Sequence, residues 1–501
     1  MRIVVFTILL AIWPAVFLFA QDYDMQWIQT PTPTSIMDFR DDTIVFSYVN
    51  VTSIAFVSTA NICDKNGNFL FFTNGINVSD RYGNIMPNGD SLSYTNQLHY
   101  EEIYPQGAPA DQNVLILPKP GSDNLYYVFH YLPIDTDILL PNFVYLEPTR
   151  FYYSVVDMNA NMGLGDVVQK NVPIPIPGVQ CASKMTAVKH ANGRDWWIIR
   201  HGFKDNTYIK YLFTPNGISG PFIQNIGPAF EQGGTAYDFY GNSAFNLQGT
   251  QMASVNAYSP TVILDFDRCS GEFSNLLVIQ NRLTDTTILG GYGLCFSPSG
   301  RFLYVNTKLL LNQYDLWSAT PNDSVELYKV DSNDYAFMHQ QRLGPNGKIY
   351  IGTYHGGTSH LHVINHPDSL GLACGFQFKG QECMTSNTNK LPNMVNYKLG
   401  ALVGSGCDTL ISSLPPNPQR GLKNIIQISP NPASDVVKIT IADNREQLQL
   451  VIYNAVGQVV KQTIISGYLL LDVSDLPNGI YHIITGGDTG KLYKARFVVA
   501  R

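Results

Sequence analysis

The segment Phe296-Ser297-Pro298-Ser299-Gly300-Arg301-Phe302-Leu303-Tyr304-Val305 contains the structural unit that recurs along most of this 501-residue chain. A short turn of Pro, Ser and Gly separates two apolar runs. Pro restricts φ and Gly tolerates positive φ, so together they favour a chain reversal. Phe, Leu, Tyr and Val after the turn are typical of a β-strand. The segment therefore predicts a strand, a tight turn and a second strand.

Five other segments repeat this pattern: Asn61–Phe72, Pro118–Phe129, Ala187–Ile199, Asn246–Val255 and Leu343–Ile351. The turn glycines of the six units are spaced 54, 72, 56, 51 and 47 residues apart, and they are Gly67, Gly121, Gly193, Gly249, Gly300 and Gly347. A four-stranded propeller blade takes about 40 to 50 residues. Because a lone sheet leaves both faces exposed, radial packing of such blades buries those faces. The body therefore predicts an all-β fold, namely a multi-bladed β-propeller.

The number of blades is harder to predict than the fold, because the sequence shows only six of these units. We expect seven blades, with six as the alternative. The seventh would form if the strand near Thr43–Tyr48 paired with a strand near Met394–Val403. The longest interval between turn glycines contains an insertion around Pro133–Arg150.

Parts of the body also resemble a family. The segments Val155–Met158, Gly163–Val167, Thr186–Trp197 and Phe296–Tyr304 are similar to secreted propeller-like proteins of Bacteroidota. The resemblance runs from about Thr52 to Tyr397. It implies propeller architecture and brings no catalytic residues with it.

The last 77 residues, Ile425–Arg501, form a separate β-rich region in which short apolar runs are bounded by Gly, Asn and Pro. Four blocks occur in order: Ser429–Ala433, Val451–Val460, Leu476–Tyr481 and Lys494–Val499. Together they resemble the C-terminal sorting domain of type IX secretion in Bacteroidota. The alternative is an ordinary C-terminal β-sandwich that only binds or pads.

This resemblance implies a partner and a fate for the tail. The tail would be recognised by the outer-membrane translocon and the sorting machinery, and then usually cleaved off. The residues that carry the sorting motif are Pro430, Asn431, Pro432, Gly457, Gly479, Tyr481, Lys494, Arg496, Phe497, Val498 and Val499.

The N-terminus has the features of a secretory signal peptide. Arg2 precedes an apolar run, Ile3–Phe19, and a small residue, Ala20, precedes the polar Gln21. We expect cleavage between Ala20 and Gln21. The alternative is a membrane anchor, which would need about 20 apolar residues without the break at Pro14.

These features predict a domain order. Residues 1–20 are the signal peptide, 21–404 the β-propeller, 405–424 a Pro- and Ser-rich linker, and 425–501 a β-sandwich sorting domain. The mature protein would have no integral membrane segment. It would be secreted, or attached to the outer cell surface, after transit through the periplasm.

Composition limits what the body can bind. Charged residues make up 14% of the chain, against about 25% in ordinary soluble domains. Aromatic residues make up 12%, and the net charge is −7. There is no long run of Lys or Arg, so the sequence predicts no nucleic-acid partner and no polybasic membrane patch.

Seven cysteines are too few to form the scaffold of so long a chain. In an exported protein some are expected to pair, and Cys374 with Cys383 is the most local candidate. No two cysteines have the spacing of a zinc site.

Several segments resemble metal-binding or phosphate-binding motifs, but each is better explained as a surface residue or a turn. His355, His360, His362 and His366 cluster in the sequence, yet no carboxylate lies at ligand spacing, so we expect no metal. Asp64–Asn68 resembles a calcium loop but lacks its bidentate Glu, and Gly486–Leu492 resembles a phosphate loop with one residue too few. We expect both to be hairpin turns.

No hydrolase signature is present, and no cofactor is expected. Asp157, Asp195, Asp265 and Asp267 are available to a channel-centred enzyme, but each falls at a strand end or turn. We therefore favour a non-catalytic binding or display module that takes a glycan or a surface protein on one propeller face. The alternative is a carbohydrate- or peptide-active enzyme with its site at the propeller channel.

Overall fold

The computed structural model describes residues 21–30, 33–41, 43–51, 58–92, 110–133, 148–178, 184–202, 205–229, 241–256, 259–279, 292–331, 333–354, 358–384, 391–408, 426–441, 448–454, 458–486 and 492–501. The chain divides into two compact units, residues 1–410 and residues 411–501. Each unit is described by itself. The predicted signal peptide, with Ala20, and the turn residue Gly457 lie outside the described residues.

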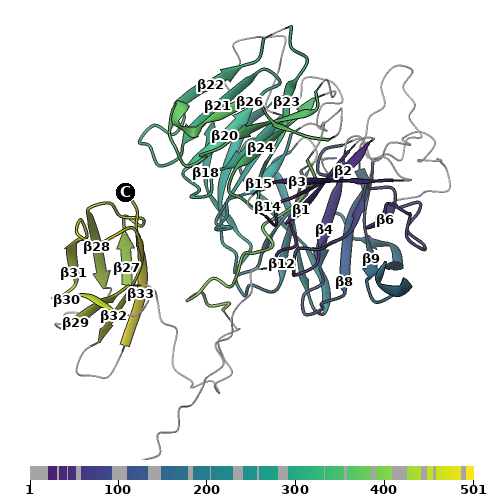
Figure 1. The fold of residues 1–501 in the computed structure, drawn as a ribbon. Coiled ribbons are helices and arrows are strands. Elements are labelled where there is room, and N and C mark those ends of the chain that lie inside the picture. The colour runs from purple at the N-terminus through teal and green to yellow at the C-terminus, as the bar shows by residue number, and fades with distance from the viewer. Residues whose placement is uncertain are drawn as a thin grey trace, which may run out of the picture. The chain divides into compact units, whose positions relative to one another are not determined.

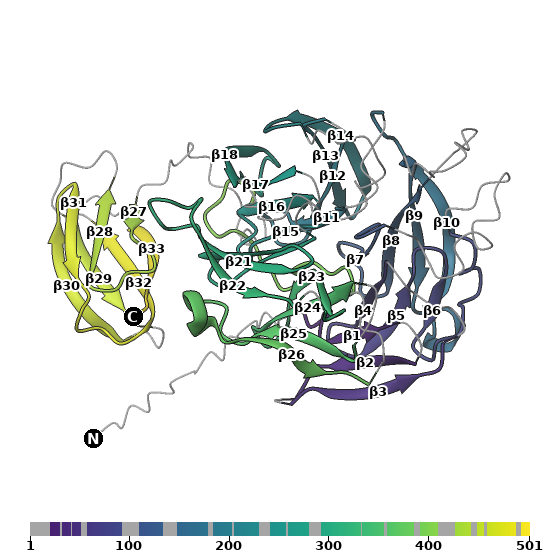
Figure 2. The same cartoon turned by 90° about the horizontal axis from the view of Figure 1, so that it is seen from above.

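The first unit contains seven antiparallel sheets among its described residues (Figures 1 and 2). Sheet 1 is β1 (Gln26–Gln29), β2 (Thr34–Asp38) and β3 (Val45–Val49), and sheet 2 is β4 (Ala60–Cys63), β5 (Phe69–Thr73) and β6 (Val78–Asp80). Sheet 3 is β7 (Val114–Pro118), β8 (Leu125–Pro133), β9 (Pro148–Asp157) and β10 (Asp166–Ile174), with the short helix η1 (Asn161–Gly163) before β10. Sheet 4 is β11 (Thr186–Lys189), β12 (Trp196–His201), β13 (Thr207–Thr214) and β14 (Gly217–Asn225).

The remaining three sheets each have four strands. Sheet 5 is β15 (Ser243–Phe245), β16 (Gln251–Asn256), β17 (Ser259–Phe266) and β18 (Phe273–Ile279). Sheet 6 is β19 (Gly293–Phe296), β20 (Phe302–Asn306), β21 (Leu310–Asp315) and β22 (Ser324–Lys329). Sheet 7 is β23 (Phe337–Leu343), β24 (Ile349–Tyr354), β25 (His360–Ile364) and β26 (Phe376–Glu382), with the short helix η3 (Gly371–Cys374) before β26.

These sheets are arranged around a common axis, as in a β-propeller (Figure 2). The first strands of sheets 2 to 7 lie innermost, and β4 contacts β7, β11 contacts β15, β15 contacts β19, and β19 contacts β23. Apolar side chains of neighbouring sheets share clusters, such as Trp197 of sheet 4 with Leu264 of sheet 5. Burial of the sheet faces between neighbours is what holds such a ring together.

The six turn glycines occupy equivalent positions. Each lies between the first and second strand of sheets 2 to 7, and each has a positive φ, between 69° and 84°. In the turn of the opening segment, the Gly300 N–H donates to the carbonyl of Ser297 at 2.9 Å. A side chain in this conformation would be strained. The prediction that each glycine marks a strand–turn–strand unit is therefore confirmed.

The predicted closure of the seventh blade is wrong. β3 pairs with β2, and residues 391–408 form no strand in the part of the chain that the structure describes. Sheet 1 instead meets sheet 7 through a buried aromatic cluster. The Trp27 ring lies 4.8 Å from Phe39 and 5.8 Å from Tyr350 of β24, measured between ring centroids. Edge-to-face contacts of this kind therefore close the ring where a shared strand was expected.

Residues 391–408, which we call the axial segment, run along the inner strands. The Asn393 N–H donates to Thr59 O at 2.7 Å, and its side-chain amide donates to Val114 O at 2.9 Å and to Met185 O at 3.1 Å. The Tyr397 hydroxyl donates to Ile116 O at 2.8 Å. The segment thus uses one backbone N–H and two side chains, rather than a strand ladder, to satisfy carbonyls of three inner edges. This explains why the expected strand does not form.

A disulfide fastens the end of the axial segment. Cys269, in the turn between β17 and β18, is bonded to Cys407. Cys374 and Cys383 are both free and buried, so the predicted local pair is wrong. Sequence proximity was a poor guide because the axial segment brings Cys407 back to a turn 138 residues earlier. The described chain thus stays attached to the propeller at Cys407, which lies within the predicted linker.

The second unit contains two sheets among its described residues. One is β27 (Ile426–Ser429), β28 (Val436–Ile441) and β31 (Tyr468–Asp472), and the other is β30 (Val459–Ile465), β29 (Leu448–Tyr453), β32 (Gly479–Gly486) and β33 (Leu492–Val499). Residues of both sheets belong to one hydrophobic cluster, including Ile439, Ile452 and Phe497. This unit therefore has a core of its own.

No helix among the described residues is long and apolar enough to cross a membrane.

The axial segment makes a testable contribution to stability. Asn393→Ala would leave buried carbonyls without donors, and each such loss costs about 1–3 kcal/mol. We expect the free energy of unfolding to fall by at least that amount, as measured by urea titration. The matched control is Asn396→Ala, because Asn396 is only half-buried and its side-chain amide donates to a single carbonyl, that of Leu247, among the described residues. Equal midpoints for the two variants would contradict the role given to Asn393.

Candidate ligand-binding pocket at the propeller axis

A cavity of about 410 Å³ opens beside the axial segment at the inner ends of several sheets. It is lined by residues of β11, β15, β19 and β23, of the turns that follow β15, β19 and β23, and of residues 394–400. Pockets that bind small molecules commonly have volumes of about 300–1,000 Å³. Its size and its position at the convergence of several sheets make this cavity a candidate binding site.

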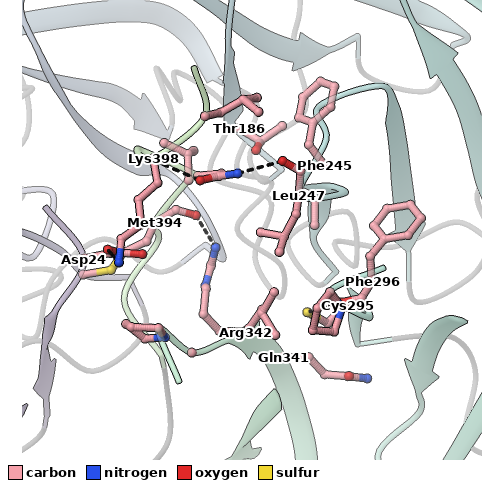
Figure 3. Close-up of a pocket in the computed structure, with 18 of the residues that line it drawn as sticks. Asp24, Thr186, Phe245, Leu247, Cys295, Phe296, Gln341, Arg342, Met394 and Lys398 are labelled. Atoms are coloured by element: carbon pink, nitrogen blue, oxygen red, sulfur yellow. Dashed lines mark hydrogen bonds and ion pairs between the residues drawn. The ribbon is translucent and has the colours of Figure 1, made fainter. Parts of the chain in front are cut away.

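The two sides of the cavity differ in chemistry (Figure 3). Phe245, Leu247 and Phe296 lie on one side, while Met394, Lys398 and Asp24 lie on the other, with Arg342 projecting between them. Leu247 keeps 37% of its surface exposed, so this side of the cavity presents apolar surface to solvent. The cavity thus offers an apolar wall opposite a charged one.

The axial segment is part of the charged wall. The Asn396 amide donates to Leu247 O at 2.9 Å, which ties the segment to the turn after β15. Gly249 of the same turn has no room for a side chain, because a Cβ there would lie 2.6 Å from Leu399 and 2.7 Å from Val188. The close fit of this turn against Leu399 therefore fixes the distance between the two walls.

Arg342 is the most unusual charged group in the cavity. Its guanidinium donates to Met394 O and, at 3.4 Å, to Asn393 Oδ1. Its Nε is shielded from solvent and has no hydrogen-bond partner among the described residues. Burial lowers the pKa of Arg342 to about 10, and the opposing influences come from Cys295 and Tyr397 rather than from a carboxylate. At neutral pH the side chain is therefore still protonated, and not all of its five N–H groups have an acceptor among the described residues.

The positive charge of Lys398 is compensated by nearby carboxylates. Its Nζ lies 3.1 Å from Asp22 Oδ1 and 3.7 Å from Asp24 Oδ1. Burial raises the pKa of Asp24, whereas the nearby Lys398 acts to lower it. Of the charged residues that line the cavity, Arg342 is therefore the one for which the described residues provide no carboxylate partner.

Polar side chains bridge sheets across the axis. The Gln112 side chain accepts from the Ser243 N–H at 2.8 Å and donates to Ser243 O at 3.1 Å and to Asn393 Oδ1 at 3.2 Å. Asp111 Oδ2 and His339 Nε2 lie 3.5 Å apart, and both side chains are fully buried. These contacts join sheets 3, 5 and 7, which are not neighbours.

The clustered histidines do not converge on a metal site in the described part of the chain, where no suitable group of three ligands occurs. The His362 ring stacks on Phe378, its Nε2 is 3.1 Å from Ala336 O, and its Nδ1 accepts from the Lys379 N–H at 3.0 Å. Burial lowers its pKa to about 4. His362 is therefore a neutral core residue with both ring nitrogens engaged, whereas His355 lies outside the described residues.

The predicted carboxylates and loops have structural roles, as expected. Each Asp accepts hydrogen bonds from nearby donors: Asp157 from Asn159, Asp195 from Asn192 and Arg194, Asp265 from Gln251 and Asn275, and Asp267 from Cys269 and Ser270. Asp64 Oδ1 accepts the N–H groups of Asn66 and Asn68 in a tight turn. Gly486 pairs with Leu492 where β32 and β33 meet, and the residues between them, 487–491, lie outside the described residues.

The tail motif residues that the structure describes come together at the C-terminal strand. Asn431 accepts the Val498 N–H at 2.8 Å, Gly479 pairs with Val499, and the Tyr481 ring stacks on Phe497 with centroids 5.5 Å apart. Arg496 is exposed, and so are Pro430 and Asn431. Three blocks that are far apart in the sequence thus form one connected site within the second unit.

Sequence reasoning missed Arg342, Asn393 and the other channel residues. One signal was present, because the inner strand β23 carries His339-Gln340-Gln341-Arg342 where other inner strands, such as Val114–Pro118, are apolar. A polar run in an innermost strand indicates side chains with hydrogen-bond partners across the channel or on the next sheet, as for Gln341, which donates to Asn306 Oδ1 at 2.7 Å. The contribution of residues 391–400 left no comparable pattern.

Comparison with known proteins assigns the tail. Residues 427–500 match the family described as the secretion system C-terminal sorting domain. This match implies handling by the type IX secretion system and export to the cell surface or the extracellular space. Comparison with curated proteins gave no match.

Among solved structures, the body is similar to several proteins at low identity. A functionally unknown protein from Desulfotomaculum acetoxidans is 14% identical, with a TM-score of 0.40 and coverage of 74% of this chain and 99% of that one. The periplasmic gluconolactonase PpgL of Pseudomonas aeruginosa is 12% identical, with a TM-score of 0.40 and coverage of 74% and 98%. The Cps50 (Swd1) β-propeller domain of Myceliophteria thermophila is 10% identical, with a TM-score of 0.30 and coverage of 79% and 98%. At these levels of similarity the function of the body has to be argued from its own residues.

Proposed function

We propose that this protein is an exported, non-catalytic binding protein whose seven-bladed propeller holds a small ligand in the axial cavity. The observation that carries the proposal is the cavity itself, with an apolar wall, a charged wall and an incompletely satisfied Arg342. Such a combination of apolar surface with a few oriented polar groups is typical of ligand sites. The seven sheets around one axis support the blade count.

The match of the tail to a sorting domain supports a proposal for how the protein is exported. We infer that residues 1–20 are removed after Ala20, that the host belongs to Bacteroidota, and that the tail is a β-sandwich recognised by the type IX translocon. Removal of the tail downstream of Cys407 would leave the axial segment bonded to Cys269. The mature propeller would thus keep its cavity. A glycan or surface protein on a propeller face remains a further candidate partner, supported by the aromatic composition of the chain.

A second candidate function is supported by one specific contact. Asp111 and His339 face each other from sheets 3 and 7, which is how a channel-centred enzyme would assemble an acid and a base. Both side chains are fully buried, however, and a substrate has to reach within hydrogen-bond distance of such a pair. We therefore favour a structural role for this pair.

The structural role of the pair predicts the outcome of Asp111→Asn. Leaving a buried polar group without its partner costs about 1–3 kcal/mol, so we expect a lower unfolding midpoint and unchanged ligand affinity at a temperature where the variant is folded. Circular dichroism and calorimetric titration measure the two quantities. If a hydrolase screen found activity in the native protein that this variant lost while folded, the enzyme alternative would replace our proposal.

Export and binding should be separable. Deleting residues 494–501 removes most of β33, which pairs along its length with β32, and should block surface delivery while the propeller stays folded. Fractionation of cells that express the full chain and the deletion measures delivery, and protease resistance of the periplasmic propeller measures folding. Normal amounts of truncated protein in the medium would show that the sorting role of this segment is wrong.

A further inference from the structure

We propose that the axial cavity binds an organic monoanion with an apolar body, and that Arg342 receives the anionic group. This inference rests on the proposed binding function and adds the chemical class of the ligand. It follows from the charge, the hydrogen-bonding state and the surroundings of one side chain.

The first step concerns charge. Three ionisable side chains line the cavity, namely Asp24, Lys398 and Arg342. Lys398 forms ion pairs with Asp22 and Asp24. No carboxylate of the described residues forms an ion pair with Arg342, so its guanidinium lies beside the apolar wall as a cation without an acidic partner. In surroundings of low polarity such a charge attracts an anion more strongly than it would in water.

The second step concerns hydrogen bonds. Arg342 is anchored by Met394 O and Asn393 Oδ1, which fix the guanidinium against the axial segment. A guanidinium has five N–H donors, and a carboxylate can accept two of them side by side. Nε has no acceptor among the described residues although it is shielded from solvent. A ligand atom cannot reach a nitrogen that is shielded in this way, so a carboxylate would accept from the N–H groups of the terminal nitrogens that are not donated to Met394 O and Asn393 Oδ1.

The third step concerns the rest of the ligand. Phe245, Leu247, Phe296 and Leu399 line the cavity, and Leu247 keeps 37% of its surface exposed. A small inorganic anion would leave this apolar surface in contact with water. An alkyl or aryl group on the anion would cover it, and this burial adds affinity in proportion to the apolar area.

The test uses calorimetric titration of the full chain with three probes of equal chain length: decanoate, decanol and decylamine. Acetate serves as the anion without an apolar body. We expect decanoate to bind at least tenfold more tightly than decanol, a difference of about 1.4 kcal/mol, and we expect no binding of decylamine or acetate. Arg342→Met, which keeps the length of the side chain, should remove the preference for decanoate.

Two variants control for other effects. Lys398→Met also removes a positive charge from the cavity, but that charge is paired, so the preference for decanoate should remain. Because Arg342→Met also loses the anchor to Met394, Leu247→Trp provides an independent test: it fills the cavity without touching that anchor and should abolish binding of every probe. Thermal unfolding checks that each variant is folded.

The outcomes separate the ligand class from the binding function. If decanol bound as tightly as decanoate and Arg342→Met changed neither affinity, the anion class would be wrong while the cavity remained a binding site. If no probe bound, or if Leu247→Trp left the binding of every probe unchanged, the proposed binding function itself would fail.

Discussion

The hydrogen bonds from Asn393 to the inner strands are the constraint on which the rest of the propeller depends. Sheets arranged around an axis leave edge carbonyls, such as those of Val114 and Met185, facing the channel without a neighbouring strand. One side-chain amide satisfies both, and it does so from a segment whose own N–H bonds Thr59. Buried backbone acceptors require such partners. The axial segment is therefore part of the propeller core rather than the start of a linker.

The same segment explains why there is a cavity and why it has two unlike walls. An inward-facing channel lined only by strands would be filled by the side chains of those strands. Here the axial segment is held to the turn after β15 by Asn396 and to the turn after β17 by Cys407. The space between the segment and Phe245, Leu247 and Phe296 is left open. Arg342 is placed in that space because its guanidinium is needed to hold Met394.

Much of the fold could be predicted from sequence because it is encoded locally. A turn such as Ser297–Gly300 needs Pro or Asn before a Gly with positive φ, and the six glycines identified in this way all occupy that turn. Closure of the ring could not be predicted in the same way. The contact of Trp27 with Tyr350 joins residues more than 300 positions apart in the sequence. A strand pairing between Thr43–Tyr48 and Met394–Val403 was plausible by composition but does not form.

The candidate site was less predictable than the fold for the same reason. Arg342, Asn393 and Asp24 carry no local motif, and each acquires its role from partners on other sheets. The carboxylates that sequence patterns did identify, such as Asp195 and Asp267, are turn residues whose donors lie within three positions. Sequence patterns predict contacts between residues that are close in the sequence. The axial cavity is instead lined by residues that become neighbours only when the propeller ring forms.

Hydrogen–deuterium exchange of the full chain, read by mass spectrometry, tests the central claim most directly. If residues 391–408 are part of the core, the amides of Asn393 and Leu402, which donate to Thr59 O and Ala191 O, should exchange as slowly as those of the inner strands β7 and β11. Exchange of these amides at the rate of an unstructured peptide, with the inner strands still protected, would contradict the account. The axial segment would then have to be regarded as a free linker, and the cavity would lose one of its walls.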